Sequence, residues 1–238
     1  MSKENKSNLR KRLLISLILI LIVFPVALIF YSLYDNRSYG LISIFLIILA
    51  MIPFLMIYEM KKPQAREWIP LAVMAAIGAV GRVAFAPLPS FKPTSAIVII
   101  TASVFGPEAG FLTGAISALA SNLFFGQGPW TPWQMFSWGL IGFLAGLFFK
   151  FKIIKGKKSL CLFGFLSGFL FGWIMNIFTA VSFVYDFSWK AFFALYISSF
   201  WFDFTHGFAT AVFLYFLYTP WSAKLRRIKV KFGLINEV

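Results

Sequence analysis

The stretch SLCLFGFLSGFLFGWIMNIFTAVSF, residues 159–183, decides the fold class of this chain. It contains no Asp, Glu, Lys or Arg, whereas five lysines crowd the short segment 150–158 that precedes it. A helix rises about 1.5 Å per residue, so an apolar helix of about 20 residues crosses the hydrocarbon core of a bilayer. The sequence therefore predicts a transmembrane helix over 159–183.

Seven further apolar runs lie on either side of this helix. They cover residues 13–34, 40–58, 68–86, 94–105, 108–125, 133–149 and 190–218. The run 94–105 is short, and we expect it to be a partial span or to begin inside a loop. The run 13–34 follows a basic leader, but it is too long for the apolar core of a signal peptide, so we expect it to be retained. The sequence thus predicts an all-α integral membrane protein with eight helices.

The overall composition supports this class and argues against others. The 238 residues are 60% hydrophobic and have a mean hydropathy of +0.84. The net charge is +14, but the basic residues flank the apolar runs, so the charge does not indicate nucleic-acid binding. With one cysteine, Cys161, and one histidine, His206, the chain can form no internal disulfide and no four-ligand site of His and Cys alone. We expect no metal and no resident cofactor.

The basic residues also predict the orientation of the helices. A cytosolic N-terminus places almost all of the 22 Lys and Arg residues on the cytosolic side. The exceptions are Arg37, Lys92 and Lys190 in outer loops and Arg82 within a span. This distribution follows the positive-inside rule. We therefore expect a multi-pass protein of the bacterial plasma membrane with both termini in the cytosol.

A change in composition divides the chain after the basic segment 61–66. The earlier runs are rich in Leu and Ile, whereas the later ones are rich in Gly, Ala, Trp and Phe, and small residues allow close helix packing in lipid. We predict a basic cytosolic leader at 1–12, two additional transmembrane helices within 13–67, a six-helix core at 68–219 and a basic cytosolic tail at 220–238.

Motifs of energy conversion and catalysis are missing from the sequence. It has no G-x-x-x-x-G-K-[ST] phosphate loop, no H-E-x-x-H zinc motif and no G-x-S-x-G nucleophile motif. The carboxylates within the apolar runs are too scattered to form a catalytic pair. We therefore expect no enzymatic activity.

A stripe of small residues marks the start of the predicted core. Ala72 and Ala76 are four residues apart, as are Ala75 and Ala79, so each pair shares a helix face. Such a face admits another helix closely. Two readings remain open: a docking surface for a partner, or ordinary packing inside the bundle.

Aromatic and polar residues gather around the predicted outer loop near residue 126. Glycines and prolines fix a non-helical backbone there, and Trp130 and Trp133 fit an interfacial aromatic belt. An anchor does not require Asn122 and Gln127 beside them, so a loop that lines or covers a ligand cavity is the other reading.

Asp203 and His206 lie deep in the last run, three residues apart and on one face. Charged groups at this depth face the protein interior or water. Asp203 and His206 form a structural or gating pair, or Asp203 neutralises Arg82, or either residue contacts a substrate. Arg82 itself pairs with an intramembrane acid or binds an anionic part of a ligand, and Asn176 is a lesser candidate of the same kind.

The alanine stripe and the segment GQGPWTPWQMFSWGLIGFLAG, residues 126–146, resemble the substrate-binding S-components of energy-coupling factor (ECF) vitamin transporters. The 126–146 segment is similar to the subgroup assigned to cobalamin-type substrates. The resemblance covers 68 to about 219, and the two helices before it depart from the six-helix pattern of the family.

The resemblance implies capture of a vitamin, namely cobalamin or a related corrinoid, and delivery with a membrane T-component and two cytosolic ATPases. It places T-component docking at Ala72, Ala75, Ala76 and Ala79. The substrate-binding residues that we infer by position are Arg82, Asn122, Gln127, Trp130, Trp133, Gln134, Asn176, Tyr185 and Trp189. Two alternatives remain: a self-sufficient transporter coupled to protons through Asp203 and His206, and a membrane enzyme acting on lipid.

Overall fold

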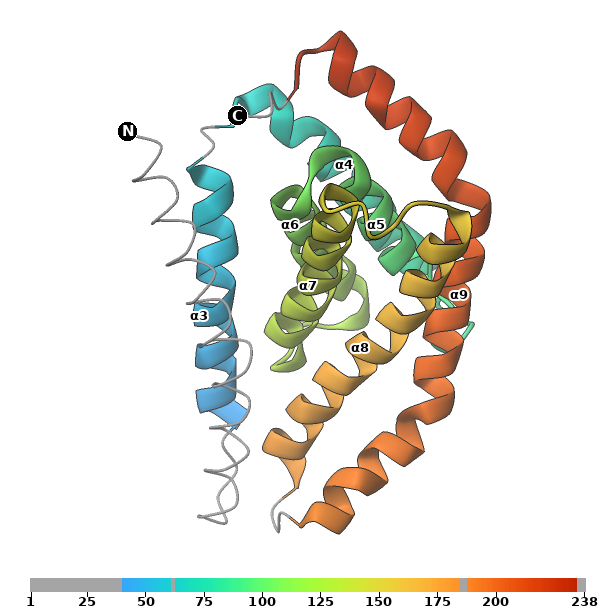
Figure 1. Cartoon of the computed structure of the whole chain (residues 1–238). Coiled ribbons are helices and arrows are strands. Elements are labelled where there is room, and N and C mark those ends of the chain that lie inside the picture. The colour runs from blue at the N-terminus through green and yellow to red at the C-terminus, as the bar shows by residue number, and fades with distance from the viewer. Residues whose placement is uncertain (1–39, 61–62, 185–187, 235–238) are drawn as a thin grey trace.

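The computed structural model describes residues 40–60, 63–184 and 188–234, which form helices and no strand (Figure 1). The helices are α3 (Gly40–Glu59), α4 (Ala65–Ala84), α5 (Thr94–Phe105), α6 (Pro107–Phe125), α7 (Trp130–Lys150), α8 (Lys157–Phe183) and α9 (Trp189–Lys231). The predicted leader 1–12, the predicted helix 13–34 and Tyr185 lie outside the described residues. The all-helical prediction is confirmed for the described part of the chain.

Three of the described helices, α4, α7 and α8, are long and apolar enough to cross a membrane. Helix α5 and the segment Ile47–Glu59 are apolar but shorter. Helix α7 begins at Trp130, three residues before its predicted start, and Pro132 lies in its first turn. Proline is tolerated there, since the first N–H groups of a helix have no partner within it.

The last helix is longer than predicted. Helix α9 has 43 residues and continues through Pro220 to Lys231. Its final turns pack on the bundle, where Leu225 is buried and the Lys229 ammonium donates to the carbonyl of Val104 at 3.0 Å. Basic residues are favoured near a helix C-terminus by the helix dipole. Residues 220–231 of the predicted tail are therefore helical.

Helix α5 occupies the centre of the bundle. All of its residues except Ser103 are buried, and α4, α6, α7, α8 and α9 all contact it. A helix that is apolar on every face is expected where other helices cover it completely. The predicted run 94–105 is therefore a helix with the predicted bounds, and it lies in the interior.

Glycines bring the core helices into close contact. A Cβ atom added to Gly142 of α7 would overlap the backbone of Gly110 of α6, and one added to Gly168 of α8 would overlap the backbone of Gly207 of α9. Helices in lipid gain little from the hydrophobic effect, so close backbone approach is a main source of their packing energy. These contacts set the spacing of the helices that carry the site.

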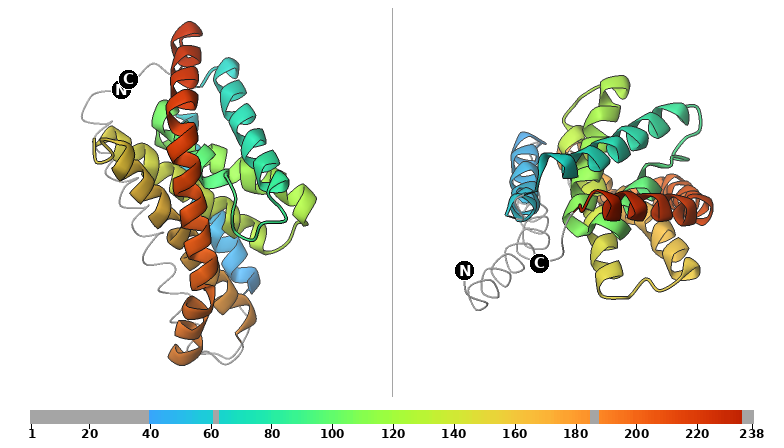
Figure 2. Two further views of the ribbon diagram at one scale, coloured as in Figure 1. Left: turned by 90° about the vertical axis from the view of Figure 1, so that its right-hand side faces the viewer. Right: turned by 90° about the horizontal axis from the view of Figure 1, so that it is seen from above.

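Helix α3 packs on the outside of the bundle against α6, α7 and α8. The Phe54 side chain is fully buried, and its ring stacks on Phe111 of α6 with centroids 4.1 Å apart. Phe143 of α7 meets the same ring edge-on at 4.8 Å. Figures 1 and 2 show α3 on the side of the bundle opposite α9.

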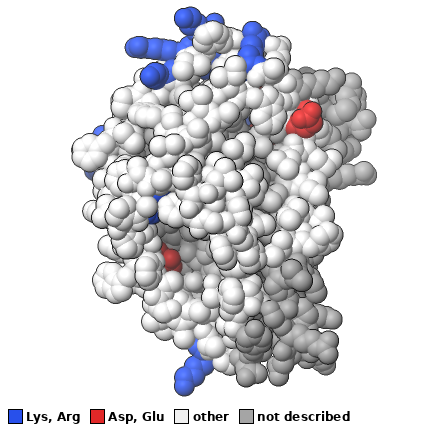
Figure 3. Space-filling view, turned by 180° about the vertical axis from the view of Figure 1, so that it is seen from behind, with Lys and Arg blue, Asp and Glu red and all other residues white. Residues whose placement is uncertain are grey.

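The two ends of the bundle differ in charge. Exposed basic residues lie around the C-termini of α7 and α9 and the N-terminus of α8, at the end that Figure 3 shows in blue at the top. They are Lys150, Lys152, Lys155, Lys157, Lys158, Lys224, Arg226, Arg227 and Lys231. We call this the basic end. We call the opposite end, with the loops 85–93 and 126–129, the loop end.

Candidate functional site: a polar cluster at the loop end

Arg82 is the centre of a polar site in the last turn of α4. Its Nη1 donates to the hydroxyl of Ser121 and to the side-chain carbonyl of Asn122, each at 2.7 Å. The guanidinium carbon lies 4.6 Å from the ring centroid of Phe125 and 5.0 Å from that of Trp138. Hydrogen bonds along one edge and aromatic rings near the guanidinium thus hold it in one position.

Asn122 joins Arg82 to the start of α7. This side chain is fully buried, and its amide nitrogen donates at 2.9 Å to both the Thr131 hydroxyl and the Gln134 carbonyl. The Thr131 hydroxyl in turn donates to Gln127 at 2.9 Å. We define the polar cluster as Arg82, Ser121, Asn122, Gln127, Thr131 and Gln134. Four of its members were predicted as substrate-binding residues, and the structure brings them together.

Arg82 has no acidic partner among the described residues. No described carboxylate lies within ion-pair distance of it, and its Nε and Nη2 atoms donate to no described residue. Asp203, the acid that we considered for this role, instead accepts a hydrogen bond from Ser199. In this structure Asp203 therefore does not neutralise Arg82.

Asp203 belongs to a second polar group, between α8 and α9. One oxygen of its carboxylate accepts from the Ser199 hydroxyl at 3.0 Å, and the Asn176 amide donates to the same hydroxyl at 2.8 Å. The carboxylate packs so closely on Gly172 that a Cβ atom there would overlap it. Asn176, which we predicted to bind substrate, thus contributes to this group instead of the polar cluster.

His206 is bonded to a different set of helices. Its Nε2 is 2.8 Å from the hydroxyl of Ser95 on α5, and the indole N–H of Trp138 donates to the same hydroxyl at 3.0 Å. The predicted pair of Asp203 and His206 therefore shares a helix face without a hydrogen bond between the two side chains. A series of contacts instead runs from Arg82 of α4 to Trp138 of α7, from Trp138 to Ser95 of α5, and from Ser95 to His206 of α9.

The predicted aromatic residues do not surround the polar cluster as one group. Trp133 is buried on the other face of α7, 5.9 Å from Phe178 between ring centroids, and its indole N–H has no partner in the described part of the chain. Trp130 is half-buried against the same apolar core, and Trp189 is exposed at the start of α9.

The four alanines of the stripe lie on two faces of α4. Ala72 and Ala76 are exposed, whereas Ala75 and Ala79 are buried inside the bundle. The carbonyl of Ala75 accepts a hydrogen bond from Ser117 of α6 at 3.2 Å. Only the pair Ala72 and Ala76 therefore offers a surface to another molecule in this conformation.

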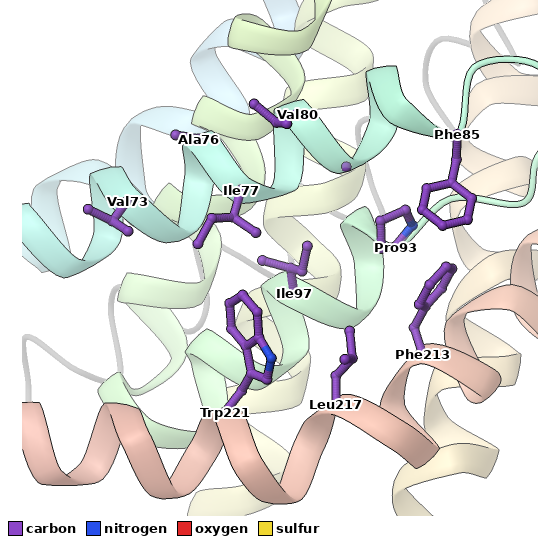
Figure 4. Close-up of a pocket in the computed structure, with 11 residues that line it drawn as sticks. Val73, Ala76, Ile77, Val80, Phe85, Pro93, Ile97, Phe213, Leu217 and Trp221 are labelled. Carbon is purple, nitrogen blue, oxygen red and sulfur yellow. The ribbon is translucent and has the colours of Figure 1, made fainter.

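An apolar groove begins beside Ala76 and runs between α4, α5 and α9 (Figure 4). Its volume is about 480 Å³. Figure 4 shows the side chains of Ile77, Ile97 and Trp221 directed toward one another across it. Its walls include Val73, Ala76, Ile97, Phe213, Leu217 and Trp221.

A family model described as "ECF transporter, substrate-specific component" matches residues 66–221, which cover α4 to α8 and most of α9. This is more than half of the chain. The chain belongs to this family. The family consists of transporter components and not of enzymes.

Curated relatives of this S-component are similar over shorter stretches. A UPF0397 protein from Vibrio atlanticus (strain LGP32) is 34% identical over 90 residues, which cover 36% of this chain and 49% of that protein. A UPF0397 protein from Aliivibrio fischeri (strain MJ11) is 32% identical over 117 residues, or 44% of this chain and 63% of that protein. The S-component thus spans about half to under two thirds of these relatives. No solved structure matches it.

Sequence reasoning missed two members of the polar cluster in this S-component. Ser121 directly precedes Asn122, and Thr131 lies three residues before Gln134 on the same face of α7. The spacing of Thr131 and Gln134 was the available signal, because residues i and i+3 of a helix are neighbours.

Proposed function

We propose that this S-component captures a vitamin at the loop end and delivers it across the membrane together with a T-component and two cytosolic ATPases. The observation that carries the proposal is the family match over α4–α9. The polar cluster supports it, because a few fixed polar groups among aromatic side chains are typical of small-molecule sites. Transport then requires ATPases outside the chain, which agrees with the absence of a phosphate-loop motif from the sequence.

The proposed orientation places the basic end in the cytosol and the loop end outside. The exposed lysines and arginines of the basic end support it, because cytosolic segments of membrane proteins are rich in these residues. Both termini would then be cytosolic, and the polar cluster would face the source of the vitamin in a bacterial plasma membrane.

The T-component, in our proposal, docks at Ala72 and Ala76 and along the apolar groove beside them. Small exposed residues let a partner helix approach closely, and the groove offers apolar walls on α4, α5 and α9. Helix α3 packs on the opposite side of the bundle, so this part of the N-terminal addition leaves the groove open.

A cobalamin or a related corrinoid is our best proposal for the ligand. The support is the resemblance of the segment 126–146 to the cobalamin-type subgroup. Trp130 at the start of α7 and Trp189 at the start of α9 add aromatic surface, which suits a large flat ligand.

Purification and mass spectrometry test the proposal. We expect the full chain to bind a vitamin without ATP, and a bound corrinoid to add a visible absorption band. Uptake should require the T-component and the ATPases, and should stop when the ATPases are inactivated. Uptake by the chain alone, unaffected by ATPase loss, would show instead that the chain is a self-sufficient transporter.

A further inference from the structure

Two cations lie near the C-terminal end of α4. Arg82 lies in the last turn, and Lys92 reaches back from the following loop to donate to the carbonyls of Phe85 and Ala86. Burial lowers the pKa of the Lys92 ammonium below its ordinary value, and the nearby charge of Arg82 lowers it further. In the described residues, no carboxylate forms an ion pair with either side chain.

The helix dipole does not balance this charge. A helix C-terminus carries the equivalent of about −0.5 elementary charge, whereas a protonated Lys92 and Arg82 together bring two positive charges. Among the described residues, more than one positive charge therefore remains uncompensated in a site that is partly removed from water. An anion bound at such a site interacts more strongly with the two cations than it would in bulk water, because the effective dielectric constant is lower there.

The guanidinium of Arg82 is arranged for a planar anion. Its Nη1 is used by Ser121 and Asn122, while Nε and Nη2 donate to none of the described residues. These two nitrogens form one of the edges at which arginine binds a carboxylate or phosphate through two parallel hydrogen bonds. The contacts with Phe125 and Trp138 hold the group in place, so little freedom is lost when an anion binds.

We propose that Arg82 and Lys92 bind a carboxylate or phosphate group of the transported compound. This inference rests on the proposed function and narrows its substrate to compounds with an anionic group. Arg82 supplies the two-point contact, Lys92 supplies a further charge, and the other members of the polar cluster position the arginine. A phospholipid headgroup carries the same chemistry, so the experiment separates the two sources.

The experiment measures the thermal unfolding of the full chain in nanodiscs of phosphatidylcholine, which has no net charge. Inorganic phosphate is titrated against chloride at constant ionic strength. Phosphate also stabilises proteins by exclusion from their surface, and this part should be equal in all variants. The site itself should add an increase of a few degrees, at about ten times its Kd, in the wild-type protein.

The decisive variant is Arg82→Gln, and Arg66→Gln is its matched control, because Arg66 is exposed at the other end of the same helix. We expect Arg82→Gln to remove the phosphate-specific increase and Arg66→Gln to keep it. Lys92→Gln, a loop substitution, should weaken phosphate binding about three- to tenfold. It provides the test if the Arg82→Gln protein does not fold. Equal phosphate responses in the wild-type, Arg82→Gln and Lys92→Gln proteins would overturn the proposal.

A second arm uses nanodiscs of phosphatidylglycerol, whose headgroup is anionic. A phosphate response that is unchanged there assigns the site to a soluble anion. A response that disappears in the wild-type protein assigns it to the lipid, and overturns the assignment to the transported compound. The proposed function has a separate readout, because a neutral vitamin that copurifies with both wild-type and Arg82→Gln protein would sustain that function while contradicting this inference.

Discussion

Phe54 of α3 lies flat against Phe111 of α6, with ring centroids 4.1 Å apart and an interplanar angle of 3°. Both side chains are fully buried. This stacked pair attaches α3 to α6, and so to the rest of the described bundle. Helix α3 is therefore a structural part of the bundle.

Replacing Phe54 with alanine should loosen this attachment. Removing a buried phenylalanine leaves a cavity, and we expect a loss of about 2 kcal/mol or more in the free energy of unfolding. Phe45→Ala on the same helix is the control, because Phe45 is 62% exposed and should change stability little. Unfolding in detergent measures both, and equal effects would show that α3 is not held by this contact.

A bulky residue on the exposed face of α4 should prevent assembly while sparing the fold. We expect Ala76→Trp to abolish copurification with a coexpressed T-component and to leave ligand binding intact. Ala75→Trp is the matched comparison, because Ala75 is fully buried and overpacking a core costs about 1–3 kcal/mol. If Ala76→Trp still copurifies with the T-component at the wild-type level, docking lies elsewhere.

A methyl group at Gly172 should disturb α8 and α9. The added Cβ would overlap the Asp203 carboxylate, so we expect Gly172→Ala to lower the free energy of unfolding by about 1–3 kcal/mol. At Gly156 a Cβ atom would meet nothing within 4 Å, and Gly156→Ala should be close to neutral. Thermal unfolding of the two variants compares them directly, and similar midpoints would contradict the close packing described here.

Asp203→Asn tests whether this carboxylate moves protons. An amide oxygen can still accept the hydrogen bond from Ser199, so we expect little change in stability and an unchanged pH dependence of uptake by the complete transporter. A proton-coupled mechanism would instead lose the pH dependence of uptake when the carboxylate is removed. Radiolabelled uptake across pH 5–8 is the measurement.

The sequence predicted where the described helices lie better than where they end. The length of an uncharged apolar run locates a transmembrane helix, because few charges are tolerated in the hydrocarbon core. The start of α7 at Trp130 was missed because the nearby prolines indicated a non-helical loop, whereas a proline in the first turn does not end a helix. Residues 220–231 were predicted as a basic tail, and α9 continues to Lys231 because its final turns pack on the bundle. The central position of α5 required knowledge of which helices surround it.

The sequence predicted only some members of the polar cluster. Arg82 and Asn122 stand out because such side chains are rare in apolar helices. Ser121 and Thr131 do not, since hydroxyl groups commonly bond to their own helix backbone. The rotation of α7 about its axis separates Thr131 from Trp133, and that rotation depends on contacts with α3, α6 and α8 that no single segment reveals.

The buried position of α5 bears on how the chain enters the membrane. Its 12 residues span about 18 Å, less than the thickness of the hydrocarbon core, and as an interior helix it makes little contact with lipid. An isolated α5 would therefore be a poor substrate for lateral release from the translocation channel. Gly106 alone separates it from α6, so we expect the two helices to partition into the bilayer as one hairpin. Biogenesis would then proceed by pairs of helices at this point of the chain.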